Sequence, residues 1–263
     1  MSRVKLLFLQ ILVIIVFLGI WHVVSTTSLF GEVKTIQFFF STPGEVLART
    51  WKQLTGAEIY WHLGITLTET VLAFVIGSAA CIFFGFAFAR NALLAAVFDP
   101  YIKAANALPR VVLAPIFALW FGLGIWSKVA LGFTLVFFIV FFNVYQGVRE
   151  VSPTVLANAR MLGMNERQLF RHVYWPSALT WMFSSLHTSV GFALVGAVVG
   201  EYLGSSAGLG YKIHEAESVF DVTGVFSGML ILAIFVIVID ALVTLVEYRL
   251  LVWRPGQSST TTT

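Results

Sequence analysis

Three ionisable side chains lie inside apolar stretches of the chain: Arg110, His187 and Asp240. A charge in hydrocarbon is costly, so such groups usually face the interior of a helix bundle, where they contact a transported ion or one another. Arg110 is a candidate for attracting an anion, and snorkelling of its side chain to the membrane surface is the alternative. For His187 and Asp240 the alternative is a hydrogen bond between packed helices. These three residues are the candidates for a pathway through a membrane.

Other chemistry finds little support in the sequence. The single Cys81 excludes an intrachain disulfide and a cysteine metal cluster. His187 has no second His or Cys at metal-ligand spacing, and no nucleophile stands with a base. The glycines of residues 204–210 follow no strand, and the chain has no G-x-x-x-x-G-K-[ST] loop for a nucleotide. We therefore expect no enzyme, no metal site and no cofactor bound by this chain.

The composition indicates a membrane protein that must position these groups among helices. Of its 263 residues, 59% are hydrophobic and 11% are charged, which is more apolar than a soluble domain needs. The formal net charge is +3, and the basic residues are scattered at the ends of apolar runs. We therefore expect the lipid bilayer, and no nucleic acid, as the surroundings of this chain.

The apolar runs predict an all-α polytopic fold with about six transmembrane helices. We expect one membrane domain over residues 1–255 and a disordered low-complexity tail over residues 256–263. A cleaved signal peptide is the alternative for the first span, but its long apolar run favours a retained anchor. The predicted spans are residues 6–24, 66–90, 93–122, 129–148, 177–201 and 225–250.

The third span is interrupted by Pro100, Pro109 and Pro115, which should kink or break it. Broken helices are tolerated in a bilayer only where they are buried in protein or line a cavity. This segment, which carries Arg110, is therefore a second indication of a pathway.

Other patterns predict how particular helices pack. In the second span, small residues recur every four positions at Ala73, Gly77, Cys81 and Gly85, which predicts close helix packing. Glu69 lies near the outer end of this span, and we expect it at the membrane interface, with contact to the substrate as the alternative. A helix over residues 44–54 lies outside the bilayer, with Leu47, Trp51 and Leu54 on its apolar face.

A polar loop at residues 149–176 interrupts the apolar chain. Ser152-Pro153 is typical of a helix start, and Gly163 is typical of a helix end. Asn165 can cap a second helix from Glu166 to about Tyr174. Apolar residues share one face of each helix, so the loop should bind the membrane domain on one side and offer the other to a partner. These apolar faces are Val155, Leu156, Ala159 and Leu162 in the first helix, and Leu169, Phe170, Val173 and Tyr174 in the second.

Arginine and lysine are more frequent on the side that holds both termini and this loop. The positive-inside rule therefore predicts that the termini and the loop are cytoplasmic.

The loop resembles the EAA loop of the permease subunits of bacterial ABC importers. In that motif Glu-Ala-Ala is followed by Gly after three residues and by Ile-x-Leu-Pro after nine more. Here the triplet is Ala157-Asn158-Ala159, without the initial Glu, and Trp175-Pro176 replaces Leu-Pro. The resemblance implies a coupling helix that rests on a cytoplasmic ATPase, and an ordinary amphipathic loop is the alternative. The implied coupling residues are Ala157, Asn158, Ala159, Arg160, Gly163, Arg167, Val173 and Pro176.

A second resemblance, to the nitrate, sulfonate and taurine branch of these permeases, extends from about Pro43 to Trp253. It rests on Ser41-Thr42-Pro43-Gly44-Glu45-Val46, Asp99-Pro100, Leu108-Pro109-Arg110, Leu113-Ala114-Pro115, Leu119-Trp120-Phe121-Gly122-Leu123-Gly124, Trp126-Ser127-Lys128 and Gly208-Leu209-Gly210. It implies a homodimeric permease domain in the bacterial inner membrane, flanked by ATP-binding ATPase subunits and supplied by an extracytoplasmic solute-binding protein. The implied substrate is a small anionic solute such as a sulfonate, taurine or nitrate.

The alternative function is a stand-alone secondary transporter. Such a protein usually carries ion-coupling carboxylates near the middle of the membrane and often an internal repeat. The sequence offers one deep carboxylate, Asp240, and no evident repeat. Copurification of an ATPase would separate the two functions.

Overall fold

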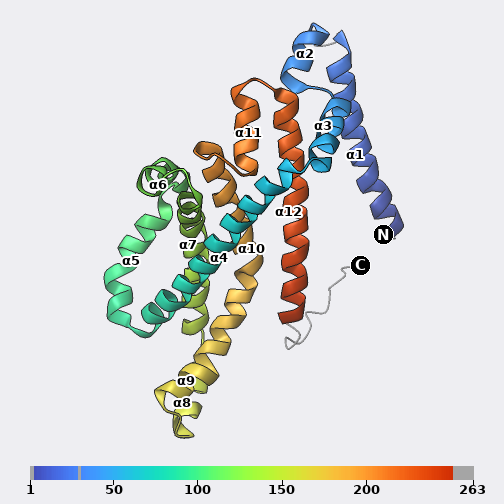
Figure 1. Ribbon diagram of the computed structural model, residues 1–263. Coiled ribbons are helices and arrows are strands. Elements are labelled where there is room, and N and C mark those ends of the chain that lie inside the picture. The colour runs from blue at the N-terminus through green and yellow to red at the C-terminus, as the bar shows by residue number, and fades with distance from the viewer. Residues whose placement is uncertain (1–2, 29–30, 251–263) are drawn as a thin grey trace.

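The computed structural model describes residues 3–28 and 31–250, and all regular elements in these residues are helical (Figure 1). The predicted disordered tail, residues 256–263, lies outside the described residues. The helices are α1 (Arg3–Thr26), α2 (Val33–Phe40), α3 (Pro43–Thr55), α4 (Glu58–Arg90), α5 (Ala92–Ala107), a 3-10 turn (Arg110–Leu113), α6 (Ala114–Phe121), α7 (Ile125–Arg149), α8 (Pro153–Met161), α9 (Glu166–Leu169), a π-helical turn (Phe170–Tyr174), α10 (Trp175–Leu203), α11 (Leu209–Ser218) and α12 (Val222–Leu250).

The predicted polytopic all-α fold is confirmed. Among the described residues, α1, α4, α7 and α12 are each long and apolar enough to cross a membrane, and α5 with the segment up to Phe121 forms a fifth candidate, bent by 88°. The remaining predicted span corresponds to α10, which has 29 residues. At 1.5 Å per residue it is about 43 Å long, enough for a bilayer. Figure 1 shows α10 running beside α7 between the same two ends of the molecule.

The molecule has two ends of different construction (Figure 1). The loop end carries α8 and α9, which connect α7 to α10. The opposite end carries α2, α3, α6 and α11, and the turn from α10 into α11 lies there. The long helices connect these two ends, so a displacement of a helix at one end also displaces it at the other.

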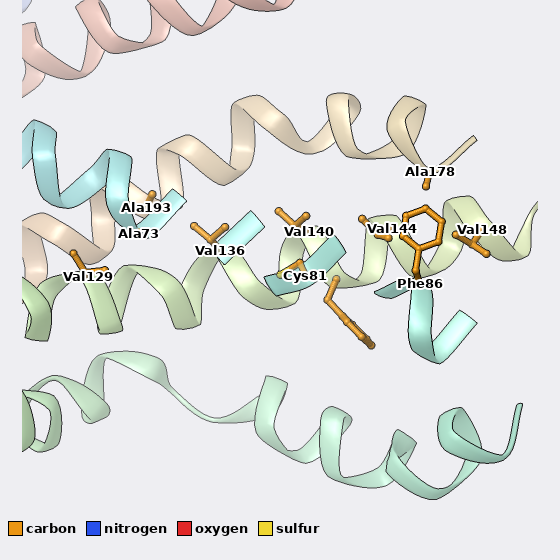
Figure 2. Packing of buried hydrophobic residues seen from close by; sticks show 11 residues of the cluster. Ala73, Cys81, Phe86, Val129, Val136, Val140, Val144, Val148, Ala178 and Ala193 are labelled. Atoms are coloured by element: carbon orange, nitrogen blue, oxygen red, sulfur yellow. The ribbon is translucent and has the colours of Figure 1, made fainter. Parts of the chain in front are cut away.

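The core lies where α4, α7 and α10 pack together, and small residues permit the close approach. Ala73 and Cys81 are fully buried, and a Cβ atom on Gly77 would lie 2.9 Å from Val136 Cγ1. Figure 2 shows the valines of α7 in a row against α4 and α10. The predicted small stripe of the second span is therefore confirmed as the packing face of α4.

The contact between α7 and α10 is tighter still. A Cβ atom on Gly196 of α10 would collide with the backbone of Gly132 in α7. Two helix backbones can approach this closely only where neither residue carries a side chain.

The helix that precedes the second span packs on the bundle through residues next to its predicted apolar face. In α3 the buried residues are Pro43, Val46 and Thr50, which face α12, whereas Leu47 and Trp51 are 55% and 72% exposed. Leu54, the last residue of the predicted apolar face, is half-buried and packs on the cluster of Ile59, Leu209 and Ile231. On the buried face, Thr50 Oγ1 donates a hydrogen bond of 3.1 Å to Ser227 Oγ of α12, a contact that apolar periodicity does not reveal.

The third span breaks as its prolines predict, but they have different effects. Pro100 lies inside α5, while the chain turns at Leu108-Pro109, and Pro115 occupies the first turn of α6. Proline is tolerated in a first turn because the N–H groups there have no intrahelical partner. The 88° bend lies at the break that contains Leu108-Pro109, where a proline disfavours helical backbone in the residue before it.

Candidate functional site

The first helix of the polar loop has the ends that its sequence predicts. The Ser152 side chain accepts a hydrogen bond from the Thr154 N–H, and Pro153 opens α8. Gly163 has φ +79°, a left-handed conformation that favours glycine. Its N–H donates to the Arg160 carbonyl over 2.9 Å, which closes the end of the helix.

The second helix begins as predicted and ends differently. Asn165 and Gln168 form a reciprocal capping box, with hydrogen bonds of 2.8 and 2.9 Å. The predicted helix end near Tyr174 was wrong, because the chain continues through a π-helical turn directly into α10. Pro176 has no N–H for an α-helical bond, and a widened turn accommodates that loss. The loop is therefore continuous with a long helix of the core.

Aromatic and polar contacts fix one side of the loop to the bundle. The Phe170 ring lies 4.9 Å from the Phe86 ring, and Trp175 stacks on Phe86 at 5.7 Å. Ser177 Oγ donates to the Gly147 carbonyl over 2.6 Å, and Arg90 pairs with Glu166. These contacts hold the start of α10 against α4 and α7.

The other side of the loop faces outward. Met161 and Leu162 are 85% and 79% exposed, so the prediction that Leu162 packs on the membrane domain was wrong. Val155, predicted on the same face, is exposed as well. Ala159, also predicted on this face, is buried, so that part of the prediction is confirmed.

The eight predicted coupling residues divide in the same way. Ala159 is buried and Val173 is half-buried. The remaining six lie on the exposed surface: Ala157, Asn158, Arg160, Gly163, Arg167 and Pro176.

Two of the three predicted pathway residues meet in the structure. His187 Nε2 of α10 pairs with Asp240 Oδ1 of α12, and their side chains are 42% and 58% exposed. Arg110 makes different contacts. Its Nη2 donates to the Asn106 carbonyl over 3.1 Å, and its guanidinium lies 4.8 Å from the centre of the Phe138 ring. His187 and Asp240 therefore form one hydrogen-bonded pair, and Arg110 is held separately.

The opposite end holds a buried polar cluster that sequence reasoning missed. Glu69, predicted at the membrane interface, is 1% exposed, so that prediction was wrong. Lys128 is also 1% exposed and Glu201 is fully buried. A signal was present, because His62, Thr66 and Glu69 stand at i, i+4 and i+7 and lead into the small stripe of α4.

A second ionic contact at this end is exposed to solvent. Lys212 Nζ of α11 lies 3.1 Å from Glu58 Oε1 and 2.5 Å from Glu215 Oε2. Burial alone would lower the pKa of Lys212, but its hydrogen bonds to Glu215 and Glu58 outweigh that effect and raise the pKa. The amine therefore stays charged and attaches α11 to the start of α4.

No group of three or more His, Cys, Asp or Glu side chains within residues 3–28 and 31–250 is arranged to hold a metal ion. What the described geometry offers is a docking surface at one end, an ion pair between α10 and α12, and a buried polar cluster at the other end.

Comparison with known proteins gives consistent matches. Residues 77–252 match the family described as "Binding-protein-dependent transport system inner membrane component". The formylaminopyrimidine transport permease protein ThiX of Halalkalibacterium halodurans is 32% identical over 220 residues, covering 84% of this chain and 88% of that protein. The taurine transport system permease protein TauC of Escherichia coli is 25% identical over 244 residues, covering 91% and 87%.

A solved structure supports the fold. An inward-facing structure of the MetNI methionine ABC transporter aligns with a TM-score of 0.57 and 17% identity, covering 78% of this chain and 94% of that chain. At this identity the likeness concerns the fold alone.

Proposed function

This chain belongs to the family of binding-protein-dependent transport system inner membrane components, in the sulfonate and taurine branch of ABC importer permeases, and we propose that residues 149–176 are its docking surface for the ATPase. Membership makes it a multi-pass inner-membrane subunit of an importer, not an enzyme in itself. ATP is bound by the separate ATPase, and a solute-binding protein is the other partner that the family implies.

The observation that carries this proposal is the exposed tip of the loop. Met161 and Leu162 project from a segment whose helices are capped by Ser152 and by the Asn165–Gln168 pair, which are residues of the loop itself. Large exposed apolar side chains beside Arg160 and Arg167 suit a protein groove better than water. Since the loop continues into α10, a force applied there acts directly on the core.

The orientation of the chain follows from this proposal. An ATPase that uses cytoplasmic ATP must meet the loop end in the cytoplasm, so both termini are placed on that side. The excess of arginine and lysine at the same end supports this placement.

We place the pathway beside the ion pair of His187 and Asp240 and assign a second copy of the chain to complete it. The two side chains are half exposed in a single chain, and an ion pair facing lipid would be costly. A homodimer would cover the pair or enclose it around a solute. Arg110, in the broken third span, is the cation proposed to attract an anionic solute.

The proposed substrate is a small anion such as a sulfonate, taurine or nitrate. The name of TauC supports it, while the name of ThiX refers to formylaminopyrimidine. ThiX, which covers a similar share of this chain, is named for a different kind of solute. The substrate of this chain must therefore be tested separately from its coupling to the ATPase.

Replacement of Gly163 tests the docking proposal. Proline fixes φ near −65° and cannot take the observed +79°, whereas asparagine tolerates the left-handed conformation. We expect Gly163→Pro to insert in the membrane and lose the copurifying ATPase, and Gly163→Asn to keep it. Full ATPase binding by Gly163→Pro would contradict the proposal.

Uptake measured in vesicles tests the transport function and its substrate class. We expect ATP-dependent uptake of taurine or a related sulfonate by the wild type with its ATPase and binding protein. Transport without any ATPase would support the secondary transporter instead. Replacing Arg110 by Gln should weaken uptake of an anion, and unchanged uptake and affinity would remove Arg110 from the pathway.

A further inference from the structure

The buried cluster at the opposite end is built around the first three N–H groups of α11. The N–H of Gly208 donates to His62 Nδ1 over 3.0 Å, and that of Leu209 donates to Thr66 Oγ1 over 3.0 Å. The N–H of Gly210 donates to Glu201 Oε2 over 2.7 Å. The first N–H groups of a helix have no partner within the helix, so here side chains of α4 and α10 satisfy three of them in succession.

Glu201 is the residue that joins these side chains. Its Oε1 accepts a hydrogen bond of 2.6 Å from Thr66 Oγ1, while Oε2 accepts from Gly210. A Cβ atom on Gly208 would collide with the Glu201 carboxyl group, which therefore lies directly against the turn. Its negative charge also faces the positive end of the α11 dipole. We call His62, Thr66 and Glu201 the α11 clasp.

A third element meets the clasp through Lys128. Its Nζ donates to the carbonyls of Leu123 and Gly124 over 2.5 and 3.1 Å, at the turn between α6 and α7. The ammonium is also attracted by the carboxylate of Glu201, and the Lys128 side chain packs against Gly200, where an added Cβ atom would lie 3.0 Å from Lys128 Cγ. The clasp therefore brings together α4, α10, α11 and the turn that precedes α7.

The two buried glutamates cannot have the same role. Two carboxylates beside one ammonium would leave a net negative charge in a buried site, which is strongly unfavourable. Glu201 accepts charge-assisted hydrogen bonds from Gly210 and Thr66, so it is the ionised partner. Glu69 lies beside Glu201, but its Oε2 has no hydrogen-bond partner in the described part of the chain, so it does not hold the start of α11.

We propose that Glu201 is a positioning residue that makes α11 move together with α10 when the ATPase acts on the loop end. This proposal rests on the proposed function, because it needs the ATPase at the loop. The route is one helix, since α10 begins beside the docking loop and ends two residues beyond Glu201. The α11 clasp connects the end of that helix to α11 and to the start of α4 on the extracytoplasmic side.

Hydrogen exchange of the amides of residues 208–210 tests the clasp itself, in the wild-type chain reconstituted in nanodiscs. We expect Glu201→Gln to accelerate this exchange about tenfold, as the loss of a charge-assisted bond predicts. Glu69→Gln is the matched control, because it makes the same substitution at a neighbouring buried glutamate that accepts none of these N–H groups, and exchange should stay within about twofold of the wild type. Equal acceleration of hydrogen exchange in both variants, or no acceleration in either, would contradict the role of Glu201 in the α11 clasp.

Transmission along α10 is tested by a reporter on α11. His214→Cys places a thiol on an exposed position, and the native Cys81 is fully buried and does not compete for a maleimide probe. In the permease–ATPase complex we expect ATP to change the labelling rate. This response should survive in Glu69→Gln and be lost in Glu201→Gln, with basal ATP hydrolysis and ATPase binding unchanged.

The outcomes separate this inference from the proposed function. An ATP response of undiminished size in Glu201→Gln would overturn the positioning role. Loss of basal hydrolysis together with the response would show a structural defect and would also overturn it. Failure of any ATPase to bind the wild type would reject the proposed function, whereas the exchange experiment would still decide the clasp.

Discussion

The two ends of the molecule satisfy their backbone groups in opposite ways. At the loop end the caps are local, since Ser152 bonds two residues ahead and Asn165 pairs with Gln168 three residues ahead. At the opposite end the caps come from distant helices, and the bond between Leu209 and Thr66 spans 143 residues. A locally capped segment is complete without the bundle and can present its exposed side to a partner. A helix capped from elsewhere is part of the bundle and follows its movements.

The close contact between α7 and α10 connects these ends, and breaking it should have the largest effect. Gly196→Ala would place a Cβ atom against the Gly132 backbone, and overpacking of this kind costs roughly 3 kcal/mol or more. Gly191→Ala is the control on the same helix, where nothing lies within 4 Å of the added atom. Unfolding by SDS in mixed micelles should show a loss for Gly196→Ala alone. Equal stability of the two variants would mean that α10 does not pack as described.

Alanine in place of glycine should have unequal effects at the two ends. Gly208 and Gly163 have φ of +110° and +79°, so alanine is strained at both positions. At Gly163 the added atom meets nothing within 4 Å, and we expect a cost of about 1 kcal/mol. At Gly208 it collides with Glu201, and the strained backbone alone costs about 2 kcal/mol.

The measurement for this pair is the free energy of unfolding together with hydrogen exchange at residues 208–210. Gly208→Ala should lose stability and amide protection, while Gly163→Ala keeps the protection. A larger loss of stability for Gly163→Ala than for Gly208→Ala would contradict the assignment of local caps to the loop end and of caps from distant helices to the opposite end.

The smallest effect is expected at the ion pair of Arg90 and Glu166 on the loop end. Their side chains are 41% and 63% exposed, and such pairs contribute about 0–1 kcal/mol. Glu166→Gln should therefore leave the unfolding free energy within about 1 kcal/mol of the wild type. A larger change would show that the loop is held by charge and not mainly by Phe86, Phe170 and Trp175.

The sequence predicts the elements far better than it predicts their polar contacts. Apolar runs identify the long helices, and Ser152, Gly163 and Asn165 mark local helix ends, because each of these signals lies within a few residues of its effect. Glu69 was misplaced at the interface because its partners Lys128 and Glu201 lie far along the chain. The packing of Leu162 was misjudged for a related reason, since Leu162 follows the last residue of α8 and no longer continues its apolar periodicity.

The candidate site was partly predictable for the same physical reason. Each of His187 and Asp240 is recognisable as an intramembrane ionisable group, but their pairing depends on how α10 crosses α12. Arg110 could be located in the broken third span, yet its contact with Phe138 depends on the 88° bend. Residue type indicates that a partner is needed, and only the packing of helices identifies it.

The difference between the two ends is tested most directly by hydrogen exchange of the reconstituted chain, measured with and without its ATPase. Exchange is followed in the same samples at the loop end and at residues 208–210. We expect the ATPase to slow exchange over α8 and the residues that follow it to Gly163. The amides of residues 208–210 should be protected in both preparations, because the α11 clasp is internal to the chain. Unchanged exchange in α8 with the ATPase bound would contradict the assignment of the loop end as the docking surface.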